Sequence, residues 1–472
     1  MEWKESGTPN QLLLDNKLYR KASEVALLKN EYFVSKVNNL RRKFNPQTLD
    51  LTGCRKAMGS KRCSLSLKFV SVQDVEKIIR KLKPSKAVAI DQLDSYSIRI
   101  SAKLVSEPIH HLIMLSLMQQ KFPTSWNNAK VLPLHKKGCV LERKNYRPVS
   151  ILSPLSKVLE RVIYDQVYSY FSSNKIFHPN IMGYRKNRST LTAVLQMYDR
   201  WVRGAESKMV SGIVLLDLSA AFDLVSPPIL IEKLKIYGLA DDVICWIQCY
   251  LSERKQAVWV DHTLSSWLDV CVGVPQGSIL GPLLFVIFAN DLPFKVTCHL
   301  DQYADDSTLS CVKQTTAEIN GSLNEDCRIV SDWMTQNELC LNADKTHLMI
   351  AGTTQRVNNA LNEQSITVQM DEVVLSESVG KCEKLLGVVF QSNLKWNKHI
   401  QDLELRLKTR LAGLRKIKFF SSQKLRKIVA ESIFQSILTY CISVWGGAGK
   451  GEIELSSQNC FECTQSILIR IP

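Results

Sequence analysis

The chain has 472 residues, of which 45% are hydrophobic and 22% are charged, and its formal net charge at pH 7 is +16. This balance describes a globular protein of two to four compact units, while the lack of a membrane-length apolar run and of a secretory signal excludes the membrane-spanning and secreted classes. The positive excess favours a polyanionic partner such as nucleic acid, and a generic basic protein is the alternative.

The first hundred or so residues are predicted to be mainly helical. Residues 22–44 form a helix with basic ends, which is either a solvated helix face or an RNA contact, and the first reading is preferred. Residues 46–66 carry Pro, Gly and Ser and are predicted to be a linker. Two further helices are expected over 72–82 and 97–121, because each has an apolar stripe and stops just before a proline.

Residues 124–190 are predicted to be a basic lobe rich in strands and prolines. Its positive side chains are Lys130, Lys136, Lys137, Arg143, Lys144, Arg147, Arg185, Lys186 and Arg188. Arginine binds phosphate oxygens in a bidentate manner and lysine acts as a point charge. One or two of Lys136, Lys137 and Arg147 are therefore expected to bind a triphosphate, with Lys136 and Arg147 as the chosen candidates, and the rest are expected in solvent or on a template backbone.

The segment 211–312 begins with an apolar strand, 212–216, that ends at Asp217. A helix follows, with proline in its first turn and Gly238 at its end. Strands are expected over 256–260 and 267–272, and a loop then leads into a very apolar helix over 279–289.

The next elements complete a recognisable arrangement. Runs 298–303 and 308–312 are predicted to form a hairpin with residues 304–306 at its turn, followed by a helix over 316–336 and a strand over 345–350. Strand, helix, hairpin, helix, strand is the ferredoxin-like order. Beyond Trp396 the chain is helical and basic, which suits a clamp on a nucleic-acid duplex.

The fourteen cysteines show no spacing framework. Cys245, Cys249 and Cys441 lie in apolar stretches and are predicted to be buried free thiols in a reducing compartment. Cys460 and Cys463 have metal-ligand spacing, but a single pair is a weak zinc signal and their role is left open.

Three acids carry the strongest chemical signal. Transfer of a nucleotide to a 3′-hydroxyl develops charge on the attacking and leaving oxygens, and two magnesium ions about 3.5–4 Å apart can stabilise both. Magnesium prefers carboxylate oxygens. Asp217 and Asp305 are the expected bridging ligands, and Asp306 at the turn supports them. An Ala-Asp-Asp turn alone is usually a solvated hairpin tip, and the upstream Asp217 favours the metal site instead.

Other residues near these acids suit a nucleotide pocket. Phe222 can lie beneath the incoming sugar and exclude a 2′-hydroxyl, or it can anchor the following helix as a core aromatic. Gln276, on a glycine-containing loop, suits the nucleotide sugar or the template strand, and a turn-exposed glutamine is the alternative. Ala221 and Gly277 are assigned to the same substrate-binding set. Lys345 is a candidate to protonate the pyrophosphate leaving group, or it is a solvated lysine.

These segments resemble, in order, the reverse transcriptases of non-LTR (LINE-type) retrotransposons, particularly the jockey-like elements of arthropods. The resemblance covers most of residues 80–445. Its blocks are 122–126 with 134–138, 145–152, 183–190, the Asp217 segment, 273–282, 303–306, 341–346 and 386–388. Eight blocks in one order make the resemblance specific.

The resemblance implies an α+β right-hand polymerase fold with fingers, a ferredoxin-like palm and a helical thumb. The expected divisions are an N-terminal helical extension and linker (1–80), fingers (81–210), palm with the catalytic site (211–395), and thumb with a truncated C-terminal segment (396–472).

The resemblance also implies the reaction, its ligands and its surroundings. The expected activity is RNA-directed DNA synthesis with two magnesium ions, for which manganese can substitute. The implied partners are template RNA, primer DNA and deoxynucleoside triphosphates, without a membrane. By the same resemblance Asp217, Asp305 and Asp306 are metal ligands, Phe222 and Gln276 line the nucleotide pocket, and nuclear or cytoplasmic residence as a ribonucleoprotein is expected.

Two departures from the family pattern leave alternatives open. Ala89 stands where the family usually has glycine, so a strained or altered turn is expected in the early RNA-binding segment. The family's upstream endonuclease domain is not recognised, so the chain is interpreted as a fragment or a copy that lost its front end. These departures motivate one alternative, a decayed copy that binds RNA without catalysis. A separate alternative is an RNA-directed RNA polymerase, which a gate ring at Phe222 disfavours.

Overall fold

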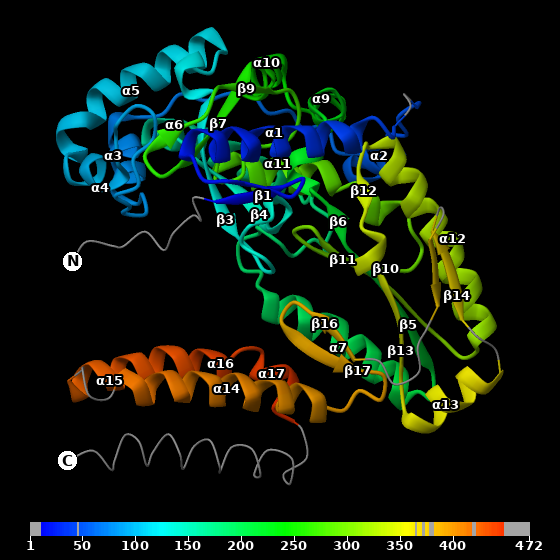
Figure 1. Cartoon of the computed structure of the whole chain (residues 1–472). Coiled ribbons are helices and arrows are strands. Elements are labelled where there is room, and N and C mark those ends of the chain that lie inside the picture. The colour runs from blue at the N-terminus through cyan, green and yellow to red at the C-terminus, as the bar shows by residue number, and fades with distance from the viewer. Residues whose placement is uncertain are drawn as a thin grey trace. The chain divides into compact units, whose positions relative to one another are not determined.

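The computed structural model describes residues 11–44, 47–363, 366–370, 373–376, 382–417 and 422–447 (Figure 1). The chain divides into two compact units, each built from separate stretches of sequence. Unit 1 comprises Met1–Pro179, Leu218–Lys295 and Asp332–Cys340, and unit 2 comprises Asn180–Asp217, Val296–Ser331 and Leu341–Pro472.

Unit 1 contains a five-stranded sheet. Its strands are β3 (Asn128–His135), β4 (Tyr146–Ile151), β7 (Arg254–Val260), β8 (Thr263–Leu264) and β9 (Leu268–Val270). The order is β4-β3-β7-β8, and β9 also pairs with β7. β3 and β7 are parallel, whereas the other pairs are antiparallel. The predicted strands 256–260 and 267–272 are therefore confirmed, the second in a shorter form.

The helix predicted over 22–44 is α1 (Ala22–Arg41), and it packs on this sheet. Asn30 Nδ2 donates to the carbonyl of Gln256 on β7 at 3.3 Å, and Gln256 Nε2 donates to Asn30 Oδ1 at 2.9 Å. The preferred reading of a solvated basic face is wrong at Lys29, which is fully buried with its ammonium 3.7 Å from the centre of the Tyr146 ring. Burial lowers the pKa of Lys29 to about 8.

The other helices of unit 1 agree with the sequence in part. The predicted helix 72–82 is α3 (Val72–Arg80), but the expected linker 46–66 contains α2 (Thr52–Met58). The helix expected over 97–121 is broken at Ser101 into α4 and α5. The remaining bounds are α4 Ser95–Ile100, α5 Ala102–Gln119, α6 Pro154–Ser173, α8 Ala221–Leu224, α9 Pro227–Ile236, α10 Asp241–Leu251 and α11 Leu280–Ala289.

Two details correct expectations in this unit. The region 124–190 is not mainly strands, because α6 occupies twenty residues of it and is almost entirely apolar on its buried side. Ala89 is buried without a positive φ, and Gln92 adopts the left-handed conformation instead (φ 58°). The strain expected at Ala89 is therefore absent, since the turn moves the positive φ three residues along the chain.

Unit 2 is built on a four-stranded antiparallel sheet in the order β10-β11-β5-β13. The strands are β5 (Val210–Leu216), β10 (His299–Tyr303), β11 (Asp306–Lys313) and β13 (His347–Ala351). In chain order this is 2-3-1-4, which is the ferredoxin-like topology predicted from the order of elements. The central strand β5 is paired on both sides and buried along most of its length.

Helices fix this sheet through buried charges as well as apolar packing. α7 (Thr190–Glu206) carries Arg200, whose guanidinium donates to Asp301 on β10 at 2.8 Å while both side chains are largely buried. Asp326 on α12 (Thr316–Gln336) accepts hydrogen bonds from the backbone amides of Thr297 and Cys298 at the start of β10. Neighbouring helices thus hold β10 at its middle residue and just before its start.

The C-terminal part of unit 2 is helical, as predicted beyond Trp396. α14 (Asn397–Ile417) and α15 (Gln423–Ala430) are followed by a π-helical turn, Glu431–Gln435, and by two short helices. The remaining bounds in the chain are β1 Leu12–Leu14, β2 Lys17–Tyr19, β6 Leu218–Ser219, β12 Cys340–Leu341, α13 Thr354–Glu363, β14 Thr367–Met370, β15 Val373–Ser376, β16 Cys382–Leu385, β17 Val388–Gln391, α16 Ser436–Leu438 and α17 Ile442–Trp445.

The cysteine and membrane predictions have mixed outcomes. All cysteines in the described ranges are free thiols, but Cys245 is exposed and Cys249 is half-buried, so burial was predicted correctly only for Cys441. The apolar runs containing Cys245 and Cys249 form α10, whose outer face reaches solvent. Cys460 and Cys463 lie outside the described residues. Within the part of the chain that the structure describes, no helix has the length and apolarity needed to cross a membrane.

Candidate active site

The predicted acids lie at one end of the unit 2 sheet. β5 pairs with β11 so that Leu216 faces Ser307, and the next position along this register brings Asp217 opposite Asp306. Asp305 precedes Asp306 in a two-residue turn that begins with Ala304 in a left-handed conformation (φ 59°). Asp306 therefore belongs to β11, paired with Tyr303, and not to the turn itself, so the second strand begins two positions before the predicted residue 308.

Asp217 is held by three residues of the segment that leads into β13. The Lys345 ammonium lies 2.9 Å from Asp217 Oδ2, and Asn342 Nδ2 donates to the same oxygen at 2.8 Å. The backbone amide of Asn342 also donates to the Asp217 carbonyl, and the Asp217 amide donates to Thr346 Oγ1 at 3.4 Å. Lys345 lies in a short 3-10 turn and not in the strand that was predicted to begin there.

The negative charges at this end of the sheet interact. Partial desolvation and the charges of Asp305 and Asp217 raise the pKa of Asp306 to about 6, against the opposing charge of Lys345. The three carboxylates repel one another when they are ionised. A cation placed among them relieves this repulsion and stabilises their ionised forms. The Lys345 ammonium already acts in this way at Asp217.

These side chains are chemically suited to divalent metal ions. Carboxylate oxygens are the donors that magnesium prefers, and Asp217, Asp305 and Asp306 supply them. As arranged here, no group of three or more His, Cys, Asp or Glu residues among those described forms a ready metal-binding cluster. The convergence of the three carboxylates on shared ions therefore stays a prediction, and the lysine at Asp217 is the observation that supports a cation site.

The block after Asp217 begins unit 1 and carries two predicted substrate residues. Ala221 is buried and Phe222 is half-buried on the short helix α8. The Phe222 ring stacks on Phe285 of α11, with ring centres 4.6 Å apart and planes inclined by 26°. This packing agrees with the anchoring role that was considered for Phe222, and its remaining exposure is compatible with a sugar contact.

The loop of residues 273–278 is attached to α8 and to β4. The amides of Gly273 and Val274 donate to the carbonyls of Val225 and Phe222, each at 2.9 Å. On the other side the Ser150 amide donates to the Gln276 carbonyl at 2.9 Å. The main chain of the loop is therefore fixed from two directions.

Glycine is required at two positions of this loop. Gly273 has φ +87°, and a Cβ there would meet the Asp223 backbone at 2.6–2.9 Å. Gly277 has φ +115°, and a Cβ would lie 2.5 Å from the Ser150 carbonyl oxygen. Both conformations are costly for other residues, so the glycines allow the close approach that positions Gln276.

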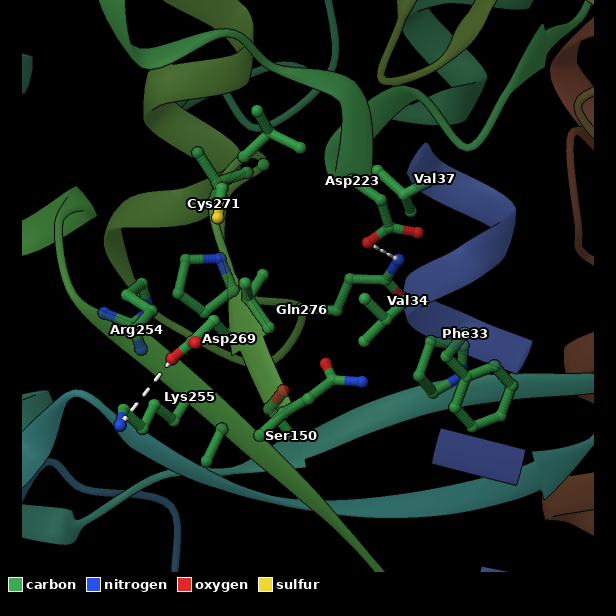
Figure 2. A pocket seen from close by; sticks show the side chains of 18 of the residues that line it. Phe33, Val34, Val37, Ser150, Asp223, Arg254, Lys255, Asp269, Cys271 and Gln276 are labelled. Atoms are coloured by element: carbon green, nitrogen blue, oxygen red, sulfur yellow. Dashed lines mark hydrogen bonds and ion pairs between the residues drawn. The ribbon is translucent and has the colours of Figure 1, made fainter. Parts of the chain in front are cut away.

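The Gln276 side chain lines a pocket of about 80 Å³ in unit 1, together with residues of α1, β7 and β9 (Figure 2). Its Nε2 donates to Asp223 Oδ1 at 2.6 Å, and Figure 2 shows the two side chains pointing toward each other. Asp223 was not singled out in the sequence. The feature of the sequence that could have drawn attention to Asp223 is its acidic side chain next to Phe222 in a mainly apolar segment.

The two basic candidates of the predicted triphosphate contact are both exposed. Arg147 lies on β4 opposite Leu134, and Lys136 follows the end of β3, where its amide donates to the Asn145 carbonyl. Their positions, on β4 and directly after β3, are compatible with a shared anion. Asn342 and Thr346, which hold Asp217, were also missed, although both lie in the segment 341–346 that had been noted for Lys345.

Comparisons with known proteins show the family to which the chain is similar. The profile of the family described as "Reverse transcriptase (RNA-dependent DNA polymerase)" matches residues 134–390. The chain is 28% identical over 411 residues to "Probable RNA-directed DNA polymerase from transposon BS" of Drosophila melanogaster, covering 82% of this chain and 43% of that protein.

Two jockey proteins are similar to the same extent. "RNA-directed DNA polymerase from mobile element jockey" of Drosophila melanogaster is 26% identical over 448 residues, covering 91% of this chain and 47% of that protein. The protein of the same description from Drosophila funebris is 28% identical over 394 residues, covering 79% and 42%. The chain thus spans less than half the length of these curated relatives.

Proposed function

The chain belongs to the reverse transcriptase family, which has the right-hand polymerase fold, and we propose that it is the polymerase of a non-LTR retrotransposon. In this role it copies template RNA into DNA by adding deoxynucleotides to the 3′-hydroxyl of a DNA primer. The observation that most supports the proposal is the gathering of Asp217, Asp305 and Asp306 at one end of a ferredoxin-like sheet within the family match.

Members of this family depend on divalent metal ions, and Asp217, Asp305 and Asp306 are the residues that would hold two magnesium ions here. Bound there, the ions would stabilise the charge on the attacking and leaving oxygens. Lys345 balances the charge of Asp217, with its ammonium 2.9 Å from Asp217 Oδ2. From there it would be the donor of a proton to the departing pyrophosphate.

The substrate residues of unit 1 have separate roles in the proposal. Phe222 and Ala221 meet the sugar of the incoming nucleotide, while Gln276 and Gly277 form the loop beside it. Arg147 and Lys136 bind the triphosphate, since both are exposed cations, one on β4 and the other directly after the neighbouring strand β3. The protein would act as a ribonucleoprotein in the nucleus, the cytoplasm or both.

Primer extension tests the proposed activity directly. The purified chain, with an RNA template, an annealed DNA primer, deoxynucleoside triphosphates and magnesium, is expected to lengthen the primer, and a chelator is expected to stop the reaction until magnesium is restored. RNA binding that weakens with salt but is accompanied by no incorporation would contradict the proposal and favour the decayed, binding-only copy.

The ring of Phe222 is proposed to let the enzyme discriminate between deoxyribonucleotides and ribonucleotides. Phe222→Ala is expected to increase the use of ribonucleotides relative to deoxynucleotides by about tenfold or more, because removing the ring makes room for a 2′-hydroxyl, and about 1.4 kcal/mol corresponds to a factor of ten. Single-nucleotide incorporation with each triphosphate measures the ratio. Phe222→Tyr keeps the ring and serves as the matched control. Unchanged sugar discrimination in Phe222→Ala would remove the gate role.

A further inference from the structure

Two cysteines face each other across the hairpin of β10 and β11, at the end away from its turn, and the proposed reaction gives them no role. His299 pairs with Ser310, so the next position along this register brings Cys298 opposite Cys311. Opposed residues of antiparallel strands have Cα atoms about 4.5–5.5 Å apart. That separation lies within the roughly 4.4–6.8 Å over which a disulfide can join two cysteines.

The sulfur atoms of both cysteines lie on the side of the sheet that α12 covers. The Cys298 thiol donates to the carbonyl of Ser322 on that helix, with 3.8 Å between Sγ and O. A Cβ on Gly212 of β5 would meet Ile319 of α12 and would also lie 3.6 Å from Cys311 Sγ. The two side chains therefore share one face of the hairpin and can meet without a change of register.

The main chain beside the two thiols is fixed, and the thiols differ in chemical character. The amides of Thr297 and Cys298 donate to Asp326 of α12 at 3.0 and 2.6 Å. A hydrogen bond from the Cys298 thiol lowers the pKa of Cys311, against the effect of burial. The same bond, burial and the Asp326 carboxylate raise the pKa of Cys298. Cys311 is thus the better nucleophile, whereas Cys298 is half-buried and the more accessible of the two.

We propose that Cys298 and Cys311 form a site of oxidative modification, at which a hydroperoxide converts the two thiols into a disulfide that closes the hairpin at the end opposite its acidic turn. The proposal does not depend on the polymerase function, because the bridge forms within the chain itself. Burial and the charges of Asp326 and Cys311 raise the pKa of Cys327 on α12 to about 12. Cys327 is therefore a neighbouring thiol and the competing partner for Cys311.

The reaction balances with hydrogen peroxide as the oxidant. Cys298 loses its proton to solvent and its sulfur attacks one peroxide oxygen, so an S–O bond forms, the O–O bond breaks and hydroxide leaves. The Cys311 thiolate then attacks the sulfur of the Cys298 sulfenic acid, so the S–S bond forms, the S–O bond breaks and a second hydroxide leaves. The protons lost by the two thiols convert both hydroxides into water. The two thiols together lose two electrons, which the peroxide accepts.

Tryptic mapping of the full chain tests the pairing directly. Cleavage after Lys295 and Lys313 releases residues 296–313 as one peptide, which contains Cys298 and Cys311 and no other cysteine. After treatment with hydrogen peroxide and then with an alkylating reagent, this peptide is expected to be two hydrogen atoms lighter than its reduced form and to carry no alkyl group. Dithiothreitol is expected to restore alkylation at both positions.

The same map identifies the competing products. Cys327 lies in the next tryptic peptide, residues 314–328, so a bridge to Cys327 would join the two peptides and would overturn the proposed pairing. A peptide 296–313 that gains oxygen atoms without forming a bridge would show that Cys298 is oxidised alone, which also overturns the proposal. A peptide that stays fully reduced and alkylated would do the same.

Thermal unfolding measures the effect of closing the hairpin. Oxidation is expected to raise the unfolding midpoint by about 4–8 °C relative to the chain in dithiothreitol, because the bridge constrains the unfolded chain. Cys298→Ser removes the accessible thiol and is expected to abolish this rise. Cys245→Ser alters an exposed thiol on α10 and is the matched control, which is expected to keep both the rise and the lighter peptide. A midpoint that oxidation leaves unchanged or lowers in the wild-type chain would overturn the closure of the hairpin.

Discussion

Asp305→Asn is expected to lower the rate of primer extension by about a thousandfold or more. The substitution preserves size but removes the charge, and a metal ion contributes several kcal/mol to stabilising the transition state. A loss of about 4 kcal/mol corresponds to roughly three orders of magnitude in rate. Single-turnover extension by one nucleotide at saturating magnesium measures the change without interference from product release.

An acid close to the site in sequence provides the control. Asp344 is exposed in the same turn as Lys345, so Asp344→Asn removes one negative charge without removing a proposed metal ligand. It is expected to extend primers at a rate within about twofold of the wild type, since exposed charges contribute little. Equal extension by Asp305→Asn and the wild-type chain would show that the metal-site assignment is wrong.

Lys233→Met is expected to destabilise unit 1 by about 3–5 kcal/mol, since it leaves a buried carboxylate without its cation. Lys233 and Asp291 are both fully buried, with 2.7 Å between Nζ and Oδ1. The ammonium also donates to the Phe288 carbonyl at 2.7 Å, while Trp333 Nε1 donates to the other Asp291 oxygen at 3.0 Å. This network joins α9, the end of α11 and α12, so its loss affects several helices.

Thermal and urea unfolding, followed by tryptophan fluorescence, measure this effect. Lys235→Met on the same helix is the matched control, because Lys235 pairs with Glu232 in solvent and should contribute less than about 1 kcal/mol. A double variant, Lys233→Met with Asp291→Leu, should recover part of the loss, since no unpaired charge remains. Similar unfolding midpoints for Lys233→Met and Lys235→Met would contradict the assignment.

The elements of the unit 2 sheet could be predicted because their patterns are local. The helix over 316–336 has the predicted bounds, and in the hairpin 298–312 the second strand begins two positions earlier than predicted. The alternation of apolar and polar residues locates strands well. The first residue of a strand after a turn, however, depends on pairing with a neighbouring strand, here of β11 with β5.

Contacts between distant segments could not be predicted in the same way. Lys29 was expected to be solvated because lysine usually is, and its burial depends on a tyrosine more than a hundred residues away. The Asp217–Lys345 pair and the Asp223–Gln276 bond also join separated segments. The resemblance identified Asp217 and Gln276 as candidates, whereas their partners became visible only in the folded chain.

The lysine at Asp217 also has a consequence for the order in which ligands assemble. One oxygen of that carboxylate already receives both the ammonium of Lys345 and the amide of Asn342. A free cation from solution must displace the ammonium of Lys345. Its net binding free energy is therefore only the difference between its own interaction with Asp217 and that of the ammonium. A cation delivered on a triphosphate brings extra oxygen ligands with it, so occupancy is expected to follow substrate arrival, and until then the charge of Asp217 is balanced by Lys345.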